Sequence, residues 1–149
     1  MSASYSYPVS QLLTLGQFFE DVNWTAESWK GYAKLGFDNS HIPELIAVLT
    51  DEELHAGCEP VPFAPVHAWR ILAELKASEA LPALVSLLRR LDDDVDDWIA
   101  SELPSVFSKI GWDSVDVLAP FAADERNGIY ARGGACRSIG EVATSVGDA

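Results

Sequence analysis

The same arrangement of apolar positions occurs three times between residues 41 and 143, each time at helical spacing. An apolar residue is followed by Pro or Asp, then any residue, then Leu, and a further apolar residue stands four positions later. This arrangement lies at 42–49, 81–88 and 115–122. Because the first turn of a helix does not use the N–H group that Pro lacks, the pattern predicts three helix starts.

A second helical pattern follows each of these starts after a polar loop. The three second patterns, 68–75, 103–110 and 135–142, align without a gap. They share two apolar columns, Leu72, Phe107 and Ile139, and Leu75, Ile110 and Val142, and one column of small residues, Ala73, Ser108 and Gly140. Equivalent positions are 32 to 39 residues apart, a period typical of stacked helical hairpins. No segment alternates with a period of two, so we expect an all-α fold.

The repeats divide the chain into a cap and a stack. We expect helical hairpins at 41–76, 80–111 and 114–143, within a repeat region 41–149. Residues 1–40 lack the pattern and predict an N-terminal helical cap, because a stack otherwise exposes a core face at its end. A length of 149 residues suits one domain that contains both parts. The third hairpin has no such cap, which allows self-association into a homo-oligomer through the C-terminal repeat.

The third repeat, DERNGIYARGGACRSIGEVA, resembles the second half of the HEAT-like repeat of phycobilisome-lyase-type proteins. Ala131-Arg132, Ala135-Cys136 and Ile139-Gly140-Glu141-Val142 carry this resemblance, which extends over about 41–143. The chain is also similar to an uncharacterised bacterial group of small HEAT-like proteins. The resemblance implies a short right-handed α-solenoid. It also implies an accessory role, lyase-like or chaperone-like, beside a partner protein.

The second repeat departs from this pattern in its inner helix. Ile99-Ala100 stands where the family has an apolar residue followed by Arg, and Pro104 lies inside the helical pattern. Since Pro removes a hydrogen bond from a helix interior, we expect the inner helix to bend or to start again at Pro104.

The charge of the chain restricts its partners. Ten Lys and Arg residues against 23 Asp and Glu residues give a net charge of −13. This charge repels nucleic acid and anionic lipid, so we expect no nucleic acid and no membrane as partner, and a protein with a basic or neutral surface instead. No apolar run is long enough to cross a bilayer, and the first residues lack the features of a signal peptide, which indicates a cytoplasmic protein. Cys58 and Cys136 are far apart and are expected to be buried thiols.

An acidic run between Leu91 and Trp98 contains most of the residues that are candidates for metal binding or partner contact. Its carboxylates belong to Asp92, Asp93, Asp94, Asp96 and Asp97. Four of them, all but Asp94, provide enough oxygen ligands for Mg²⁺ or Ca²⁺, and a metal-dependent enzyme is therefore one hypothesis. Helix capping by Asp is the stronger interpretation, since the Gly and Glu of an EF-hand and a second acidic motif are absent. We therefore expect no cofactor and interpret the run as an acidic rim that contacts a partner.

Aromatic residues near the start of each second helix are the other candidates for partner contact. Trp69, Trp98 and Tyr130 lie about one repeat apart, and the second helices of solenoids often line the binding face. Burial in the core is the competing interpretation, because aromatic residues at helical spacing usually pack inside. Arg132 follows a strongly acidic region, and we expect it to form a structural ion pair with Asp97 or Asp124.

No catalytic constellation accompanies these candidates. His67 has no Ser, Cys or carboxylate at a recognisable spacing, and no phosphate-binding or dinucleotide-binding motif occurs. The sequence therefore favours a non-enzymatic adaptor or scaffold that binds another protein through its acidic edge and concave face. The alternative is the accessory subunit that the family resemblance implies.

Overall fold

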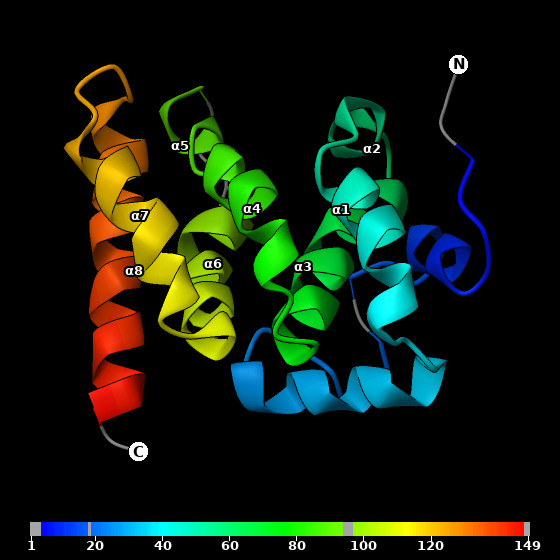
Figure 1. Ribbon diagram of the computed structural model, residues 1–149. Coiled ribbons are helices and arrows are strands. Elements are labelled where there is room, and N and C mark those ends of the chain that lie inside the picture. The colour runs from blue at the N-terminus through cyan, green and yellow to red at the C-terminus, as the bar shows by residue number, and fades with distance from the viewer. Residues whose placement is uncertain (1–3, 18, 94–96, 148–149) are drawn as a thin grey trace. The chain divides into compact units, whose positions relative to one another are not determined.

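The computed structural model describes residues 4–17, 19–93 and 97–147 of the chain. These residues form eight α-helices and five 3-10 helices and contain no β-strand (Figure 1). The prediction of an all-α fold is confirmed. The chain divides into two compact units, Met1–Leu75 and Lys76–Ala149. The stacking of all three hairpins into one right-handed solenoid stays a prediction.

The first unit begins with short 3-10 helices where the sequence predicts a helical cap. They are η1 (Val9–Leu13), η2 (Ala26–Leu35) and η3 (Asn39–His41). A 3-10 helix has three residues per turn, so residues three apart lie on the same face. Trp29 and Tyr32 occupy such a face of η2 and are both buried. The apolar spacing of this region therefore suits 3-10 helices that pack on the rest of the unit.

The first predicted hairpin lies in the same unit. It consists of α1 (Ile42–Leu49) and α3 (Ala64–Glu74), which pack together, and of the short α2 (Glu52–Ala56) and η4 (Val61–Phe63) between them. Asp38 precedes α1 in a capping box, in which its carboxylate accepts the Ser40 N–H at 2.9 Å. Helix α1 buries one stripe of side chains. Helix α3 is instead buried on all sides, from Ala64 to Ala73.

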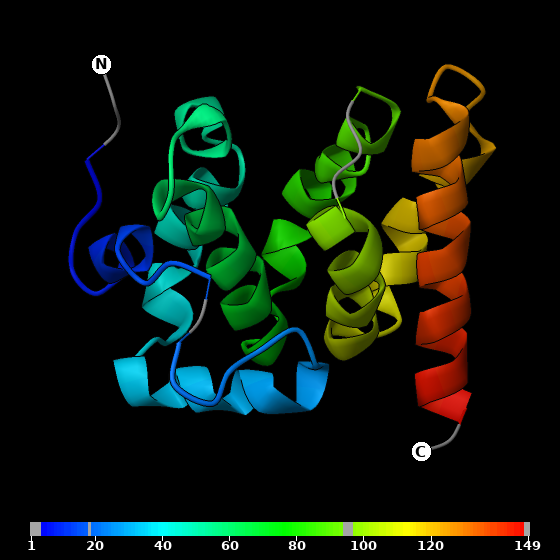
Figure 2. The ribbon, with the colours of Figure 1, turned by 180° about the vertical axis from the view of Figure 1, so that it is seen from behind.

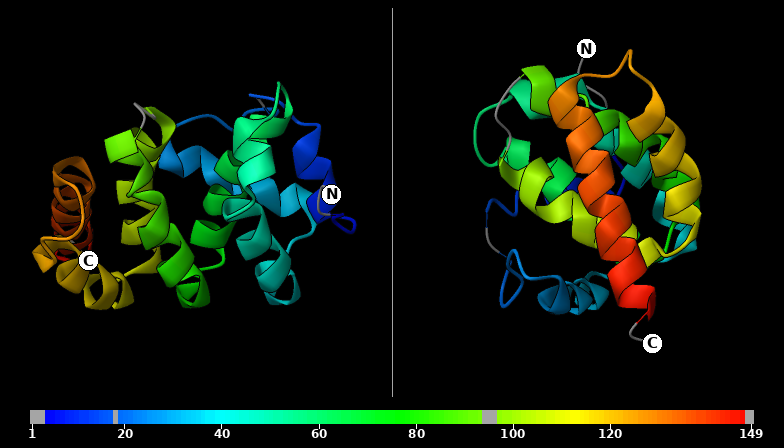
Figure 3. Two further views of the ribbon diagram at one scale, coloured as in Figure 1. Left: turned by 90° about the horizontal axis from the view of Figure 1, so that it is seen from above. Right: turned by 90° about the vertical axis from the view of Figure 1, so that its left-hand side faces the viewer.

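The second unit contains the other two predicted hairpins. After η5 (Ser78–Ala80), the second hairpin comprises α4 (Leu81–Leu87), α5 (Arg90–Asp93) and α6 (Asp97–Ile110), and the third comprises α7 (Asp113–Ala123) and α8 (Ile129–Gly147). Helix α8 packs against α6 and α7 and lies on the outside of the unit (Figure 3). Leu84 and Leu118, at equivalent positions of the repeat, are fully buried.

Helices α6 and α8 run side by side in the same direction. The Ser108 and Ser145 hydroxyls, near their C-terminal ends, are hydrogen-bonded to each other. The N-terminal ends of both helices therefore lie at one end of the unit, together with α5 (Figures 1 and 2). The described residues of the acidic run, Asp92, Asp93 and Asp97, are thereby at the same end of the unit as the start of α8.

The structure differs from two local expectations. Of the two outcomes expected at Pro104, a new helix start is wrong, because α6 continues through this residue from Asp97 to Ile110. Leu103, Pro104 and Phe107 are buried, and this packing on both sides of the proline stabilises a helix that has lost one hydrogen bond. The thiols are not buried either, because Cys58 lies in a loop and Cys136 on the outer face of α8, and both are exposed.

Candidate protein-binding surface at the start of α8

The Asp92 carboxylate caps the N-terminus of α8 from the neighbouring hairpin. Its Oδ1 atom accepts a hydrogen bond from the backbone N–H of Tyr130 at 3.0 Å, and its Oδ2 atom accepts one from that of Ala131 at 2.9 Å. The first N–H groups of a helix have no partner within the helix, and this end carries partial positive charge. A carboxylate accepts hydrogen bonds from these N–H groups, and its negative charge is attracted to this end of the helix. Asp92 is therefore a structural part of the third hairpin.

Gly128 makes room for this cap. A β-carbon at position 128 would overlap all three atoms of the Asp92 carboxyl group. The backbone of the loop can approach Asp92 closely only because the residue there has no side chain. The pair Asp92 and Gly128 thus fixes where α8 begins.

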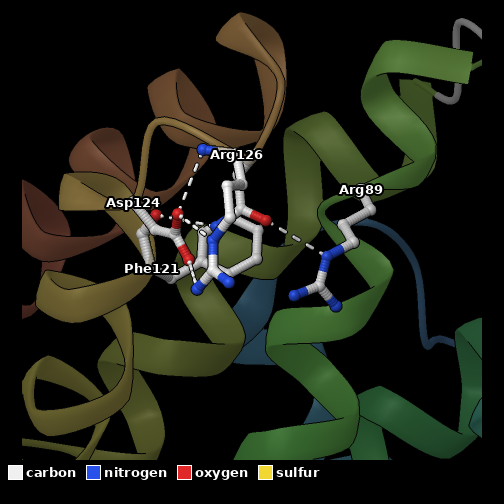
Figure 4. Close-up of polar contacts among 5 residues, drawn as sticks. Arg89, Phe121, Asp124 and Arg126 are labelled. Atoms are coloured by element: carbon white, nitrogen blue, oxygen red, sulfur yellow. Dashed lines mark hydrogen bonds and ion pairs between the residues drawn. The ribbon is translucent and has the colours of Figure 1, made fainter.

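The loop between α7 and α8 is held by further polar contacts (Figure 4). Asp124 accepts hydrogen bonds from the Arg126 backbone N–H, from its Nε at 2.9 Å and from its Nη2 at 2.8 Å. These bonds lower the pKa of the Asp124 carboxyl to about 2. From the turn between α4 and α5, the Arg89 Nε donates to Asn127 Oδ1 at 3.2 Å, and its guanidinium lies 5.1 Å from the centre of the Phe121 ring. The loop is therefore attached to the second hairpin at two points, Arg89 and Asp92.

Two large apolar side chains remain exposed on this fixed segment. Ile129 is 77% exposed and Tyr130 is 69% exposed, at the first two positions of α8. Asp93 follows the capping residue directly and is exposed, as is Asp97 at the start of α6. We call Asp93, Asp97, Ile129 and Tyr130 the acidic-apolar surface. It combines apolar area with negative charge on a backbone that is held by hydrogen bonds.

The predicted contact residues have different places in the structure. Tyr130 and Asp97 are exposed as expected for contact residues, and Trp98 is half-buried. Trp69 is only 1% exposed, so its prediction as a contact residue is wrong. It belongs to the part of α3 from Ala64 to Ala73 in which every residue is buried, so its side chain is not available to a protein partner. Asp94 and Asp96 lie outside the described residues.

The predicted ion pair of Arg132 with Asp97 or Asp124 is not formed. Arg132 Nε instead donates to the Ala122 carbonyl at 2.8 Å, near the end of α7. The last carbonyl groups of a helix lack partners within the helix and attract cations, which explains this choice. Asp124 is already paired with Arg126. Arg89 and Asp92, not Arg132, form the polar contacts between the second hairpin and the segment at the start of α8.

Within residues 4–17, 19–93 and 97–147, no group of three His, Cys, Asp or Glu side chains is placed to hold a metal ion, and the proposed ligand Asp96 lies outside these residues. Asp92, one of the four proposed ligands, uses both carboxylate oxygens to cap α8.

No helix within residues 4–17, 19–93 and 97–147 is long and apolar enough to span a membrane.

Sequence reasoning missed a buried polar chain in the first unit. His67 Nε2 lies 2.7 Å from the Gly16 carbonyl, and its Nδ1 lies 2.6 Å from the Tyr32 hydroxyl. Because a carbonyl only accepts, Nε2 carries the proton and Nδ1 accepts from Tyr32. Arg70 Nη1 donates to the Tyr32 oxygen at 3.1 Å. Burial lowers the pKa of His67 to about 4. The run from Ala64 to Ala73 gave no signal of this chain, since its partners lie up to 51 residues away.

The first unit also contains a pocket that the sequence did not indicate. Its volume is about 250 Å³, and it lies between η2 and the C-terminal end of α3. One basic residue, Lys30, and one acidic residue, Glu74, are among its lining residues, beside apolar ones. The two charged residues occur in separate helices 44 positions apart, so no local motif links them.

Comparison with known proteins gives no relative for this chain. No family model matches it, and no curated protein and no solved structure matches it either. The resemblance to HEAT-like repeats therefore stays an expectation.

Proposed function

We propose that this protein is a non-enzymatic, cytoplasmic adaptor that binds a basic or neutral segment of another protein at the acidic-apolar surface. The observation that carries the proposal is the exposure of Ile129 and Tyr130, at 77% and 69%, on a backbone fixed by Asp92. Large apolar side chains held in a rigid position are typical of binding surfaces, because little conformational entropy is lost when a partner covers them.

The charge next to this apolar pair indicates the chemistry of the partner. Asp93 and Asp97 are exposed and add to a chain of net charge −13. Such a surface attracts Lys and Arg side chains and accelerates association with a basic segment, while it repels acidic ones. Tyr is enriched among the residues that dominate binding energy, which makes Tyr130 the expected main contact.

The experiment is a quantitative affinity capture from the native host with four baits. They are the wild-type chain, the pair Ile129→Ser with Tyr130→Ser, the pair Asp93→Asn with Asp97→Asn, and the control Trp112→Ser. Trp112 is 56% exposed but lies at the other end of the unit, in the turn between α6 and α7. Asp92 stays unchanged in every bait because it caps α8.

The proposal expects a protein that the wild type and the Trp112 control retain and that both paired variants lose. With the purified partner, Tyr130→Ser should weaken binding by about 2 kcal/mol, roughly thirtyfold in Kd. The Asp pair should mainly slow association and reduce its dependence on salt. A partner that all four baits retain equally would place the interface elsewhere, and turnover of a small molecule without any partner would contradict the adaptor function.

A further inference from the structure

The pocket of the first unit has a fixed apolar wall. Tyr32, Phe37, Ile71 and Leu75 provide its apolar lining. Tyr32 cannot turn away, because its hydroxyl is hydrogen-bonded to both His67 and Arg70 inside the unit. Ile71 is only 2% exposed and lies in the part of α3, from Ala64 to Ala73, in which every residue is buried. A wall of this kind is formed before a ligand arrives, which lowers the entropy cost of binding.

Charges of both signs stand at the same pocket. Lys30 from η2 and Glu74 from α3 belong to its lining. The Lys30 side chain is exposed and forms no ion pair with any residue in the described part of the chain, so its ammonium group is available to a ligand carboxylate. A carboxylate has about four lone-pair positions, so Glu74 can accept from a ligand ammonium group in addition to the contacts it already makes.

The net charge of the chain selects among small ligands. At −13 the protein repels a ligand that is an anion overall, even though Lys30 attracts a carboxylate locally. A zwitterion has no net charge and is not repelled. The volume of about 250 Å³ is slightly below the roughly 300 Å³ at which drug-sized pockets begin. It therefore suits a compact molecule with one apolar group.

We propose that this pocket binds a small zwitterion with an apolar or aromatic body, of the chemical class of a free apolar amino acid. The carboxylate of the ligand pairs with Lys30, its ammonium group faces Glu74, and its body lies against Tyr32, Phe37 and Ile71. This inference concerns the first unit and does not depend on the acidic-apolar surface, which lies in the second.

Isothermal titration calorimetry on the full-length protein tests the proposal with three probes of similar size. They are L-phenylalanine, which carries both charges, 3-phenylpropionate, which lacks the ammonium group, and phenethylamine, which lacks the carboxylate. We expect saturable binding of L-phenylalanine with a Kd of about 0.1 to 1 mM, since small ligands gain limited energy per atom. Both analogues should bind at least tenfold more weakly.

Three variants separate a specific site from nonspecific binding. Lys30→Gln should weaken L-phenylalanine at least tenfold and leave the weak binding of phenethylamine unchanged. Ala33→Trp fills the pocket from its exposed rim and should abolish binding of all three probes. Lys34→Gln is the control, because Lys34 pairs with Glu20 outside the pocket lining, and it should bind like the wild type. Circular dichroism checks that each variant is folded.

Three results would overturn the proposal. One is the absence of saturable binding by L-phenylalanine and by L-leucine, tested as the aliphatic case. Another is equal affinity for L-phenylalanine and for one of the two singly charged analogues, which would show that the pocket does not select zwitterions. The third is binding that Lys30→Gln and Ala33→Trp both leave unchanged, which would place the ligand outside this pocket.

Discussion

At the scale of single residues, His67 is the clearest case of a side chain whose role depends on distant partners. It is buried in α3, donates to the Gly16 carbonyl and accepts from Tyr32. From the sequence, His67 shows only that it lacks catalytic partners at a recognisable spacing. A lone histidine between apolar neighbours is often a satisfied core residue, and the two hydrogen bonds of His67 make it one.

The neutral state of His67 makes stability depend on pH. Its pKa is about 4 in the folded chain, lowered mainly by burial, against 6.5 for an exposed histidine. Because the unfolded chain takes up the proton first, stability is complete above about pH 6.5 and falls as the pH drops toward 4. With a pKa of about 4 in the folded chain and 6.5 in the unfolded chain, His67 lowers the free energy of unfolding by roughly 2 kcal/mol between pH 7.5 and pH 5.

Urea unfolding at pH 7.5 and pH 5 measures this loss. His67→Gln keeps a polar side chain but cannot titrate, so the difference between the two pH values should be about 2 kcal/mol smaller in this variant than in the wild type. Carboxylates that titrate near pH 5 contribute equally to both proteins and cancel. An identical pH dependence in the two proteins would mean that His67 is not held neutral by the fold.

At the scale of helices, the sequence predicted their positions well because their starts have local causes. Pro43 and Pro82 lie in the first turns of α1 and α4, as the repeat pattern requires. The cap of α8 has no local cause, since its carboxylate comes from Asp92 in the preceding hairpin. The sequence predicts that the acidic run caps a helix, but it does not indicate that the helix capped by Asp92 is α8. Trp69 was misplaced for a related reason, because spacing alone does not show that α3 is buried on all sides.

The cap of α8 is tested by a double-mutant cycle on Asp92 and Gly128. We expect Gly128→Ala to destabilise the chain by about 2 kcal/mol, because its methyl group displaces the Asp92 carboxylate from two N–H groups. Asp92→Ala should cost a similar amount. In the double variant the two losses should overlap, since both remove the same cap, with a coupling of about 1 kcal/mol or more.

A matched glycine in the same helix serves as the control. Gly140 is exposed on α8 and has nothing within contact distance of a β-carbon. Gly140→Ala should therefore stabilise the chain by about 0.5 to 1 kcal/mol, through the lower flexibility of the unfolded state. Strictly additive losses for Asp92→Ala and Gly128→Ala would show that the two residues act independently and that the cap does not fix α8.

At the scale of the whole molecule, the excess of acidic residues is the dominant physical property. The chain carries 23 acidic against 10 basic residues, so its carboxylates outnumber its Lys and Arg cations by 13. The excess carboxylates repel one another across the surface. This repulsion opposes compact folding, and it also favours a basic partner at the acidic-apolar surface.

Added salt should consequently stabilise this protein. Raising NaCl from about 20 to 300 mM shortens the screening length from roughly 20 Å to 6 Å, which weakens the long-range repulsion more than the short contacts of paired charges. We expect the free energy of unfolding in urea to rise by about 1 kcal/mol. Glu59→Gln with Glu125→Gln, at two exposed loop positions, changes the net charge from −13 to −11 and should reduce this response. Destabilisation by salt would show instead that attraction between opposite charges outweighs the repulsion among the excess carboxylates.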